Sequence, residues 1–238
     1  MTDKMKVKIW SDTACPFCHI GKRHFENALE QFSNKDNVEI EWKSFQLDPN
    51  AQVNQNVKAV EMLAKKYGMP VEEARQMNKR METMATHAGL NFDLENIVLT
   101  NTTDAQRLIH LAKKHNLQDQ AEERLFVAYL SEGKHIGDHQ VLIQLAAEIG
   151  LDKEEVKATL ESDRYLKEVK EEMLEGQQLG INGVPFFVID DKYGVSGAQP
   201  VENFVEVLNK AWDTGHKKLE MVENSSAAVC DSNGVCSV

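Results

Sequence analysis

The spacing of apolar residues changes along the chain from a strand-like pattern to a helical one and back. Residues 38–45 alternate apolar and polar side chains, as a half-buried strand does, and residues 6–11 form an earlier β-like segment. Between these two segments, residues 19–32 carry apolar side chains at near-helical spacing. The first part of the chain therefore predicts a strand, a helix and a second strand.

A long block of helical pattern follows, from about residue 51 to residue 180. Its segments end at glycines or begin at capping residues, and Asp152 with Glu155 has the spacing of a capping box. Asp138 is a second candidate cap. The predicted helices of this block begin near residues 57, 70, 101, 118, 138, 152 and 164.

The strand pattern returns after Gly180. Residues 184–189 are a short apolar run with β character, and residues 193–196 are another short strand. Pro200 opens a last helix with one apolar side. From about residue 223 the periodicity is lost, and the composition becomes that of a flexible linker.

These patterns predict a chain of mixed α/β class with a helical insertion. Neither end of the chain has enough strands to form a stable sheet alone, so the two ends are expected to build one domain together. We therefore predict an α/β domain from residues 1–50 and 181–215, a helical insertion over residues 51–180, and a flexible tail over residues 216–238.

The composition indicates an acidic globular protein. The 238 residues include 27 basic and 38 acidic side chains, a formal net charge of −11, which argues against a nucleic-acid backbone as the main partner. No apolar run approaches the roughly 20 residues needed to span a bilayer, and residues 1–5 show no secretory signal. The four cysteines form two close pairs, unlike those of a disulfide-stapled secreted domain. We therefore expect a cytoplasmic protein without a nucleic-acid or membrane partner.

Cys15-Pro16-Phe17-Cys18 lies at the junction between the first predicted strand and helix. Two cysteines separated by two residues in this context indicate a dithiol/disulfide redox centre. The free N–H groups and positive dipole end of a helix stabilise a thiolate, and can lower a cysteine pKa from about 8.5 to roughly 3.5–7.5. We therefore predict Cys15, at the exposed start of the helix, as the nucleophile and Cys18 as the resolving thiol. Pro16 suits the first turn, where its missing N–H would have no partner.

Three other interpretations of this motif remain open. A zinc site usually needs four ligands, and the sequence offers no second Cys-x-x-Cys nearby. Residues 15–19 also spell the C-x-x-C-H haem-attachment motif, which requires an oxidising compartment. The two cysteines could also be purely structural. The strand–motif–helix context favours redox chemistry, with no metal and no cofactor beyond the cysteine pair itself.

Such a redox centre needs a surface that holds an extended substrate beside its sulfur, and residues 183–186 are the candidate. A cis Val184–Pro185 bond would turn the Val184 backbone toward the dithiol as a pairing edge, whereas a trans bond would only begin an edge strand. The residues alone do not decide between these two forms. The predicted substrate-binding residues are Val184, Pro185, Pro16 and Phe17.

The order strand, Cys-Pro-x-Cys, helix, strand and a later Val-Pro before an apolar strand resembles the thioredoxin fold, and the helical block resembles its DsbA branch. The resemblance is closer still to the FrnE-like group, which is related to 2-hydroxychromene-2-carboxylate isomerases and kappa-class glutathione transferases. The matching stretches are residues 12–21, 101–105, 125–129, 183–187 and 195–200. This resemblance implies a thioredoxin-like fold with a large all-helical insertion, a cis bond at Pro185, and protein-disulfide oxidoreductase activity.

The sequence departs from these relatives at informative positions. Ile9 stands where thioredoxins have a buried carboxylate, and Phe17 stands where the bacterial DsbA oxidants have a histidine. The strong oxidising power of those DsbA proteins is therefore not expected here. The isomerase and transferase relatives usually lack the cysteine pair, so the presence of both Cys15 and Cys18 favours thiol–disulfide exchange.

His19 and Asp12 are candidates for tuning the site. His19 could donate a hydrogen bond near the Cys15 sulfur, or it could be an ordinary histidine on the helix surface. Asp12 could contact the substrate, or it could cap the loop that precedes the motif.

The expected function is thiol–disulfide exchange with protein or small-molecule thiols and disulfides, with glutathione as a candidate co-substrate. Two other classes remain open. One is a glutathione-dependent transferase or isomerase of small aromatic compounds, and the other is a non-catalytic redox or metal sensor. The physiological substrate, the redox direction and the oligomeric state, including a homodimer, are left open by the sequence.

Cys230 and Cys236 form a second close pair, beyond the last predicted helix. The turn-rich residues 231–235 would let the two sulfurs meet. A flexible linker of about 15 residues spans roughly 20 Å, so the pair could reach the active-site face and act as a second redox centre. A metal-binding pair and two inert thiols remain alternatives.

Overall fold

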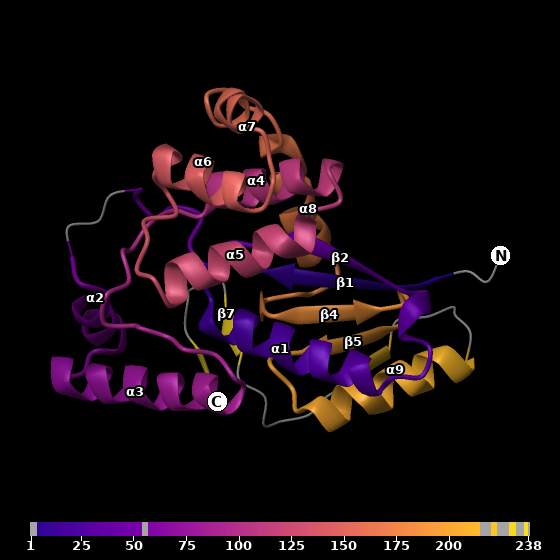
Figure 1. The fold of residues 1–238 in the computed structure, drawn as a ribbon. Coiled ribbons are helices and arrows are strands. Elements are labelled where there is room, and N and C mark those ends of the chain that lie inside the picture. Colours follow the sequence, from indigo (N-terminus) through magenta and orange to yellow (C-terminus); the bar gives the residue numbers. More distant parts are fainter. Residues whose placement is uncertain (1–3, 54–56, 215–219, 223–228, 232–235, 238) are drawn as a thin grey trace. The chain divides into compact units, whose positions relative to one another are not determined.

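The computed structural model describes residues 4–53, 57–214, 220–222, 229–231 and 236–237 (Figure 1). The α-helices in these ranges are α1 (Pro16–Gln31), α2 (Ala59–Tyr67), α3 (Val71–His87), α4 (Thr103–Lys114), α5 (Gln118–Leu130), α6 (His139–Glu148), α7 (Lys153–Leu160), α8 (Leu166–Gln178) and α9 (Val201–Thr214). The strands are β1 (Met5–Ser11), β2 (Val38–Ser44), β3 (Gly183–Val184), β4 (Phe186–Ile189), β5 (Tyr193–Ser196), β6 (Glu220–Val222), β7 (Val229–Asp231) and β8 (Cys236–Ser237). The predicted alternation of strand, helical and strand regions is confirmed.

The chain divides into two compact units. The α/β unit consists of Met1–Leu47 and Glu171–Val238, and the helical unit consists of Asp48–Lys170. The sequence predicted a boundary after residue 180, whereas this division falls inside α8, because the second half of that helix bonds to the sheet. The predicted α/β class with a large helical insertion is confirmed.

The main sheet of the α/β unit has five strands in the order β2-β1-β4-β5-β6. β1 pairs in parallel with β2 and antiparallel with β4, so Ile9 lies between Trp42 and Phe187. A separate sheet of three strands has the order β3-β7-β8. Part of the tail that was predicted to be flexible therefore forms strands, while its residues 215–219, 223–228, 232–235 and 238 lie outside the described residues.

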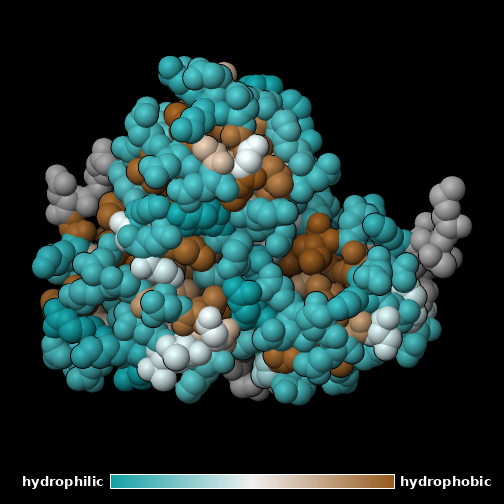
Figure 2. All heavy atoms as spheres, viewed as in Figure 1, coloured by the Kyte–Doolittle hydropathy of each residue, from teal (hydrophilic) through white to brown (hydrophobic). Residues whose placement is uncertain are grey.

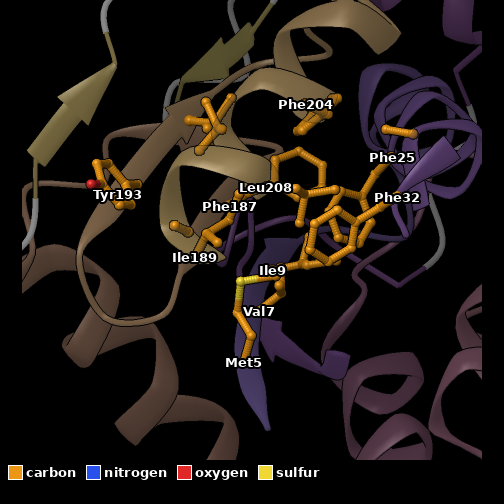
Figure 3. Packing of buried hydrophobic residues seen from close by; sticks show 14 of the residues in the cluster. Met5, Val7, Ile9, Phe25, Phe32, Phe187, Ile189, Tyr193, Phe204 and Leu208 are labelled. Atoms are coloured by element: carbon orange, nitrogen blue, oxygen red, sulfur yellow. The ribbon is translucent and has the colours of Figure 1, made fainter. Parts of the chain in front are cut away.

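The core of the α/β unit lies between the main sheet and the helices α1 and α9 (Figure 3). Phe25 of α1 contacts Phe187 of β4 and Phe204 of α9, with ring centroids 5.4 and 5.5 Å apart. Phe187 and Phe204 themselves meet edge to face at 4.6 Å. Such aromatic contacts add to the burial of large apolar surfaces, so they fix α1, and the motif at its start, against the sheet.

The second half of α8 is bonded to β1 and β2. Trp10 Nε1 donates to the Glu172 carbonyl oxygen at 2.9 Å, and the Ser44 N–H donates to the Glu172 carboxylate at 2.8 Å. Lys43 Nζ lies 3.3 Å from that carboxylate. Gly176 lets α8 approach this closely, because a Cβ at that position would lie 2.8 Å from Trp10 Nε1.

Two helices of the helical unit, α6 and α7, begin at predicted capping residues. The Asp138 side chain accepts the N–H groups of Gln140 and Val141 at the start of α6. The Asp152 side chain accepts the N–H of Glu155 at the start of α7. Each bond satisfies backbone donors that a helix start leaves without intrahelical partners, so both predicted helix starts are confirmed.

The face of the molecule in Figure 2 is mostly hydrophilic, with apolar areas between the polar ones. The large apolar side chains that are exposed among the described residues are Val53, Val57, Val71, Val98, Leu174 and Leu179. Within the described ranges, every helix is too short or too polar to cross a bilayer.

Candidate functional site

Cys15 stands at the junction of β1 and α1. It is the N-cap residue of α1, with extended backbone angles, and Pro16 occupies the first turn of the helix. The Cys15 N–H donates to the Asp12 carbonyl oxygen at 2.9 Å, and the Cys18 N–H donates to the Cys15 carbonyl oxygen at 3.0 Å. The N-cap position places Cys15 at the positive end of the helix dipole, where a thiolate is stabilised.

Both cysteines of the motif are free thiols, and neither has exposed surface. The expectation that Cys15 lies at an exposed helix start is therefore wrong. The Cys15 sulfur donates to the Val184 carbonyl oxygen of β3 at 3.7 Å. This contact joins two segments that are 169 residues apart in the sequence.

Burial raises the pKa of the Cys18 thiol well above its usual value. The hydrogen bond to Cys15 and the charge of Cys15 act in the same direction, while the Asp12 backbone and the Ser11 hydroxyl oppose the shift. Cys18 is therefore held as a neutral thiol at neutral pH. Ser11 was not singled out from the sequence, because a serine at the end of a strand carries no distinctive signal.

We expect iodoacetamide to label Cys15 before Cys18 in the reduced protein. A raised pKa keeps Cys18 as a thiol, so its labelling should stay slow even near pH 8.5, where an ordinary cysteine is about half ionised. Peptide mass spectrometry after brief labelling at pH 6, 7.5 and 9 measures both rates. Protein unfolded in urea is the control, because there the two cysteines should react at similar rates. Faster labelling of Cys18 in the folded protein would reverse the two assigned roles.

The Val184–Pro185 peptide bond is cis, so the cis form expected for this segment is the one that the structure contains. The Pro185 carbonyl oxygen accepts the Gly197 N–H at 2.8 Å, which ties this bend to the end of β5. Val184 and Pro185 are both buried. The bend directs the Val184 carbonyl toward the cysteine pair, as the contact with the Cys15 sulfur shows.

The other predicted site residues surround the pair in different ways. The Asp12 carboxylate accepts the Ala14 N–H at 3.1 Å and the Leu47 N–H at 2.8 Å, so it caps the loop before the motif. His19 is 1% exposed, so the alternative of an ordinary surface histidine is wrong. Phe17 is fully buried, and Pro16 is half-buried.

Gly21 supports the site and was missed as a functional position in the sequence. A Cβ on Gly21 would lie 2.8 Å from Pro185 Cγ and 3.5 Å from Phe187 Cζ. The absence of a side chain there lets α1 lie directly against the cis-proline segment. The only sequence signal was a glycine inside a predicted helix, where glycine is unfavourable without a packing reason.

Among the described residues there is no group of three or more histidine, cysteine or acidic side chains that could hold a metal ion. For Cys230 and Cys236 the structure describes the backbone, in β7 and β8. Val184 pairs with Cys230, and Cys230 pairs with Cys236. The two cysteine pairs that the sequence singled out are therefore brought to the same small region of the α/β unit.

A family model described as the DSBA-like thioredoxin domain matches residues 6–209. The chain is 32% identical over 206 residues to the uncharacterised protein YwbO of Bacillus subtilis, covering 85% of this chain and 95% of YwbO. It is 38% identical to the crystal structure of a probable DsbA oxidoreductase, SCO1869, from Streptomyces coelicolor, with a TM-score of 0.85 over 98% of this chain and 99% of the other. A 2-hydroxychromene-2-carboxylate isomerase structure shares the fold at 13% identity, with a TM-score of 0.63 over 87% of this chain and 94% of the other.

Proposed function

The chain belongs to the DSBA-like thioredoxin domain family, a family of thiol oxidoreductases, and on this basis we propose that it is a protein-disulfide oxidoreductase with Cys15 as its nucleophile. The DsbA-like thioredoxin fold and the predicted family are established by these matches. The observation that carries the proposal is the position of the Cys15 sulfur, at the start of α1 and 3.7 Å from the Val184 carbonyl oxygen.

The proposed reaction is two successive thiol–disulfide exchanges. The Cys15 thiolate attacks one sulfur of a substrate disulfide, a mixed disulfide forms, and the other substrate sulfur leaves as a thiolate. Cys18 then loses its proton and attacks the Cys15 sulfur, which releases the second substrate thiol and leaves the Cys15–Cys18 disulfide. The substrate gains two electrons and two protons. Run in reverse, the same steps oxidise a substrate dithiol.

The Cys18 environment supports this order of events. Burial is the largest cause of the raised Cys18 pKa, and the hydrogen bond and charge of Cys15 add to it. Once the Cys15 sulfur is part of a mixed disulfide, its negative charge is gone, so that contribution to the Cys18 pKa is lost. Cys18 therefore becomes easier to deprotonate at the step where it must act as a nucleophile.

The cis-proline segment supports a substrate with an extended backbone. Short strands such as β3 offer main-chain N–H and C=O groups that an added strand can pair with. Val184 lies in such a strand and touches the Cys15 sulfur through its carbonyl oxygen. We propose proteins or small-molecule thiols and disulfides as substrates, with glutathione as co-substrate and a cytoplasmic location, which the small number of cysteines favours.

The test is reduction of insulin with glutathione as the electron donor, followed by turbidity, for wild type and Cys15→Ser. We expect the substitution to lower the rate by more than roughly 100-fold, since it removes the nucleophile. Circular dichroism of both proteins controls for folding. Insulin reduction that persists in Cys15→Ser would refute the proposed role of Cys15. Conversion of small aromatic substrates that needs glutathione and survives Cys15→Ser would instead favour a transferase or isomerase.

A further inference from the structure

The chain places part of its own tail on the edge of the cis-proline strand. β7 pairs antiparallel with β3, with Gly183 opposite Asp231 and Val184 opposite Cys230. Figure 1 shows β7, in yellow, beside the N-terminal end of α1. The tail therefore pairs with the strand edge that an extended substrate is proposed to use.

The register of this pairing singles out one tail cysteine. Val184 is the residue whose carbonyl oxygen contacts the Cys15 sulfur, and its partner across the strands is Cys230. A shift of the register by one residue would place Val229 or Asp231 there instead. The backbone of Cys230 is thus paired with Val184, whose carbonyl oxygen contacts the sulfur of the nucleophile Cys15.

The second tail cysteine lies directly across from the first. β7 pairs antiparallel with β8, and Cys230 is opposite Cys236. Residues directly opposite in an antiparallel pair have Cα atoms about 4.5 or 5.5 Å apart, and a disulfide requires about 4.4–6.8 Å. The backbone spacing of Cys230 and Cys236 is therefore compatible with a disulfide between them.

We propose that Cys230 and Cys236 form a second redox centre that exchanges electrons with the Cys15–Cys18 pair, and that Cys230 is the cysteine that joins to Cys15. This inference rests on the proposed function, because it needs Cys15 to act in thiol–disulfide exchange. The tail pair is then an internal substrate, seated by strand pairing where an external one would bind.

The exchange balances within the chain. With the motif oxidised and the tail reduced, the Cys230 thiolate attacks the Cys15 sulfur, a Cys15–Cys230 bond forms, and Cys18 leaves as a thiolate. The Cys236 thiolate then attacks the Cys230 sulfur, which forms the Cys230–Cys236 disulfide and releases Cys15. Two electrons move from the tail to the motif, and the two protons of the tail thiols move to the motif. The reverse sequence transfers electrons to the tail.

The burial of Cys15 favours an internal partner. Cys15 has no exposed surface, so an external disulfide can reach the Cys15 sulfur only after the residues that cover it move away. A sulfur that is already held beside Cys15 needs no such movement. β7 is only three residues long, and so short a strand pairing is weak enough to open. The tail strand would thus both serve as a substrate and compete with external proteins for the edge of β3.

The experiment traps the proposed intermediate with two matched double variants. The chain has four cysteines, so Cys18→Ser/Cys236→Ser keeps only Cys15 and Cys230, and Cys18→Ser/Cys230→Ser keeps only Cys15 and Cys236. Each reduced variant is mixed with oxidised glutathione, quenched with N-ethylmaleimide at intervals, and analysed by peptide mass spectrometry and non-reducing gels. We expect the internal Cys15–Cys230 disulfide to form roughly tenfold faster than Cys15–Cys236, because strand pairing raises its effective concentration. Equal rates, a faster Cys15–Cys236 bond, only glutathione adducts, or disulfides only between chains would overturn the proposal.

A third variant separates this inference from the proposed function. Cys230→Ser/Cys236→Ser retains the Cys15–Cys18 pair, so its insulin reduction reports on the motif alone. If this variant reduces insulin but Cys15–Cys230 does not form preferentially in the trapping experiment, only the role of the tail fails. If neither this variant nor wild type reduces insulin, the proposed function fails, whatever the tail does.

Discussion

Arg107→Met is expected to lower the free energy of unfolding by about 2–4 kcal/mol, since it removes a buried guanidinium together with its hydrogen bonds. Arg107 lies on α4 and is 5% exposed. Its Nε donates to the Arg164 carbonyl oxygen at 2.8 Å, and it also donates to the carbonyl oxygens of Thr159 and Ser162. These three carbonyls lie at and after the end of α7, where a helix leaves acceptors without intrahelical partners.

The Arg107 side chain also pairs with a carboxylate. Its Nη1 lies 2.7 Å from the Asp104 carboxylate, which also accepts a bond from His139 Nε2 at 2.8 Å. Arginine suits this position because its planar group can donate to several acceptors at once, whereas methionine fills a similar volume without donating. The substitution therefore removes the hydrogen bonds with little change in packing.

Arg75→Met is the matched control, in the same unit. Arg75 pairs with Glu72 at 2.7 Å and Glu95 at 3.5 Å on the exposed face of α3, and exposed pairs contribute little to stability. Urea denaturation followed by circular dichroism should show a clear loss for Arg107→Met and almost none for Arg75→Met. Equal midpoints for the two variants would contradict the role assigned to Arg107.

Local sequence signals were sufficient to predict most of the elements. The alternation in residues 38–45 corresponds to β2, and the caps Asp138 and Asp152 stand at the starts of α6 and α7. Those features depend on residues within a few positions of one another, so the sequence reports them directly. Arg107 shows the limit, because its three carbonyl acceptors are 52–57 residues away and nothing near Arg107 in the sequence marks them.

The sequence predicted the chemistry of the site but not the burial of Cys15 or the strand pairing beside it. Cys-x-x-Cys at a strand–helix junction indicated where the sulfurs would lie, and the family resemblance implied the cis bond at Pro185. The contact of the buried Cys15 sulfur with Val184 was missed, because the two residues are 169 positions apart in the chain. The pairing of β7 with β3 was missed for the same reason, since a register between distant strands leaves no periodic pattern in either of them.

Gly21→Ala is expected to slow insulin reduction by roughly 10- to 100-fold, because small displacements of a reacting group have effects of that size. The added Cβ would lie 2.8 Å from Pro185 Cγ and 3.4 Å from the Ala198 Cα, so relief requires the cis-proline segment to move away from α1. The carbonyl of Val184 would move with it, away from the Cys15 sulfur. Alanine favours a helix over glycine by about 1 kcal/mol, while overpacking costs about 1–3 kcal/mol, so the net loss of stability should be about 0–2 kcal/mol and the protein should remain folded.

Gly176→Ala is the control that separates crowding at the site from crowding in general. A Cβ on Gly176 would also meet a neighbour at 2.8 Å, but that neighbour is Trp10 Nε1, on the contact between α8 and β1. We expect Gly176→Ala to lower the thermal midpoint while its insulin reduction per folded molecule stays close to wild type. Measuring both quantities for both variants decides the matter. A wild-type exchange rate in Gly21→Ala, or an equal loss in Gly176→Ala, would mean that the contact between α1 and Pro185 does not set the geometry of exchange.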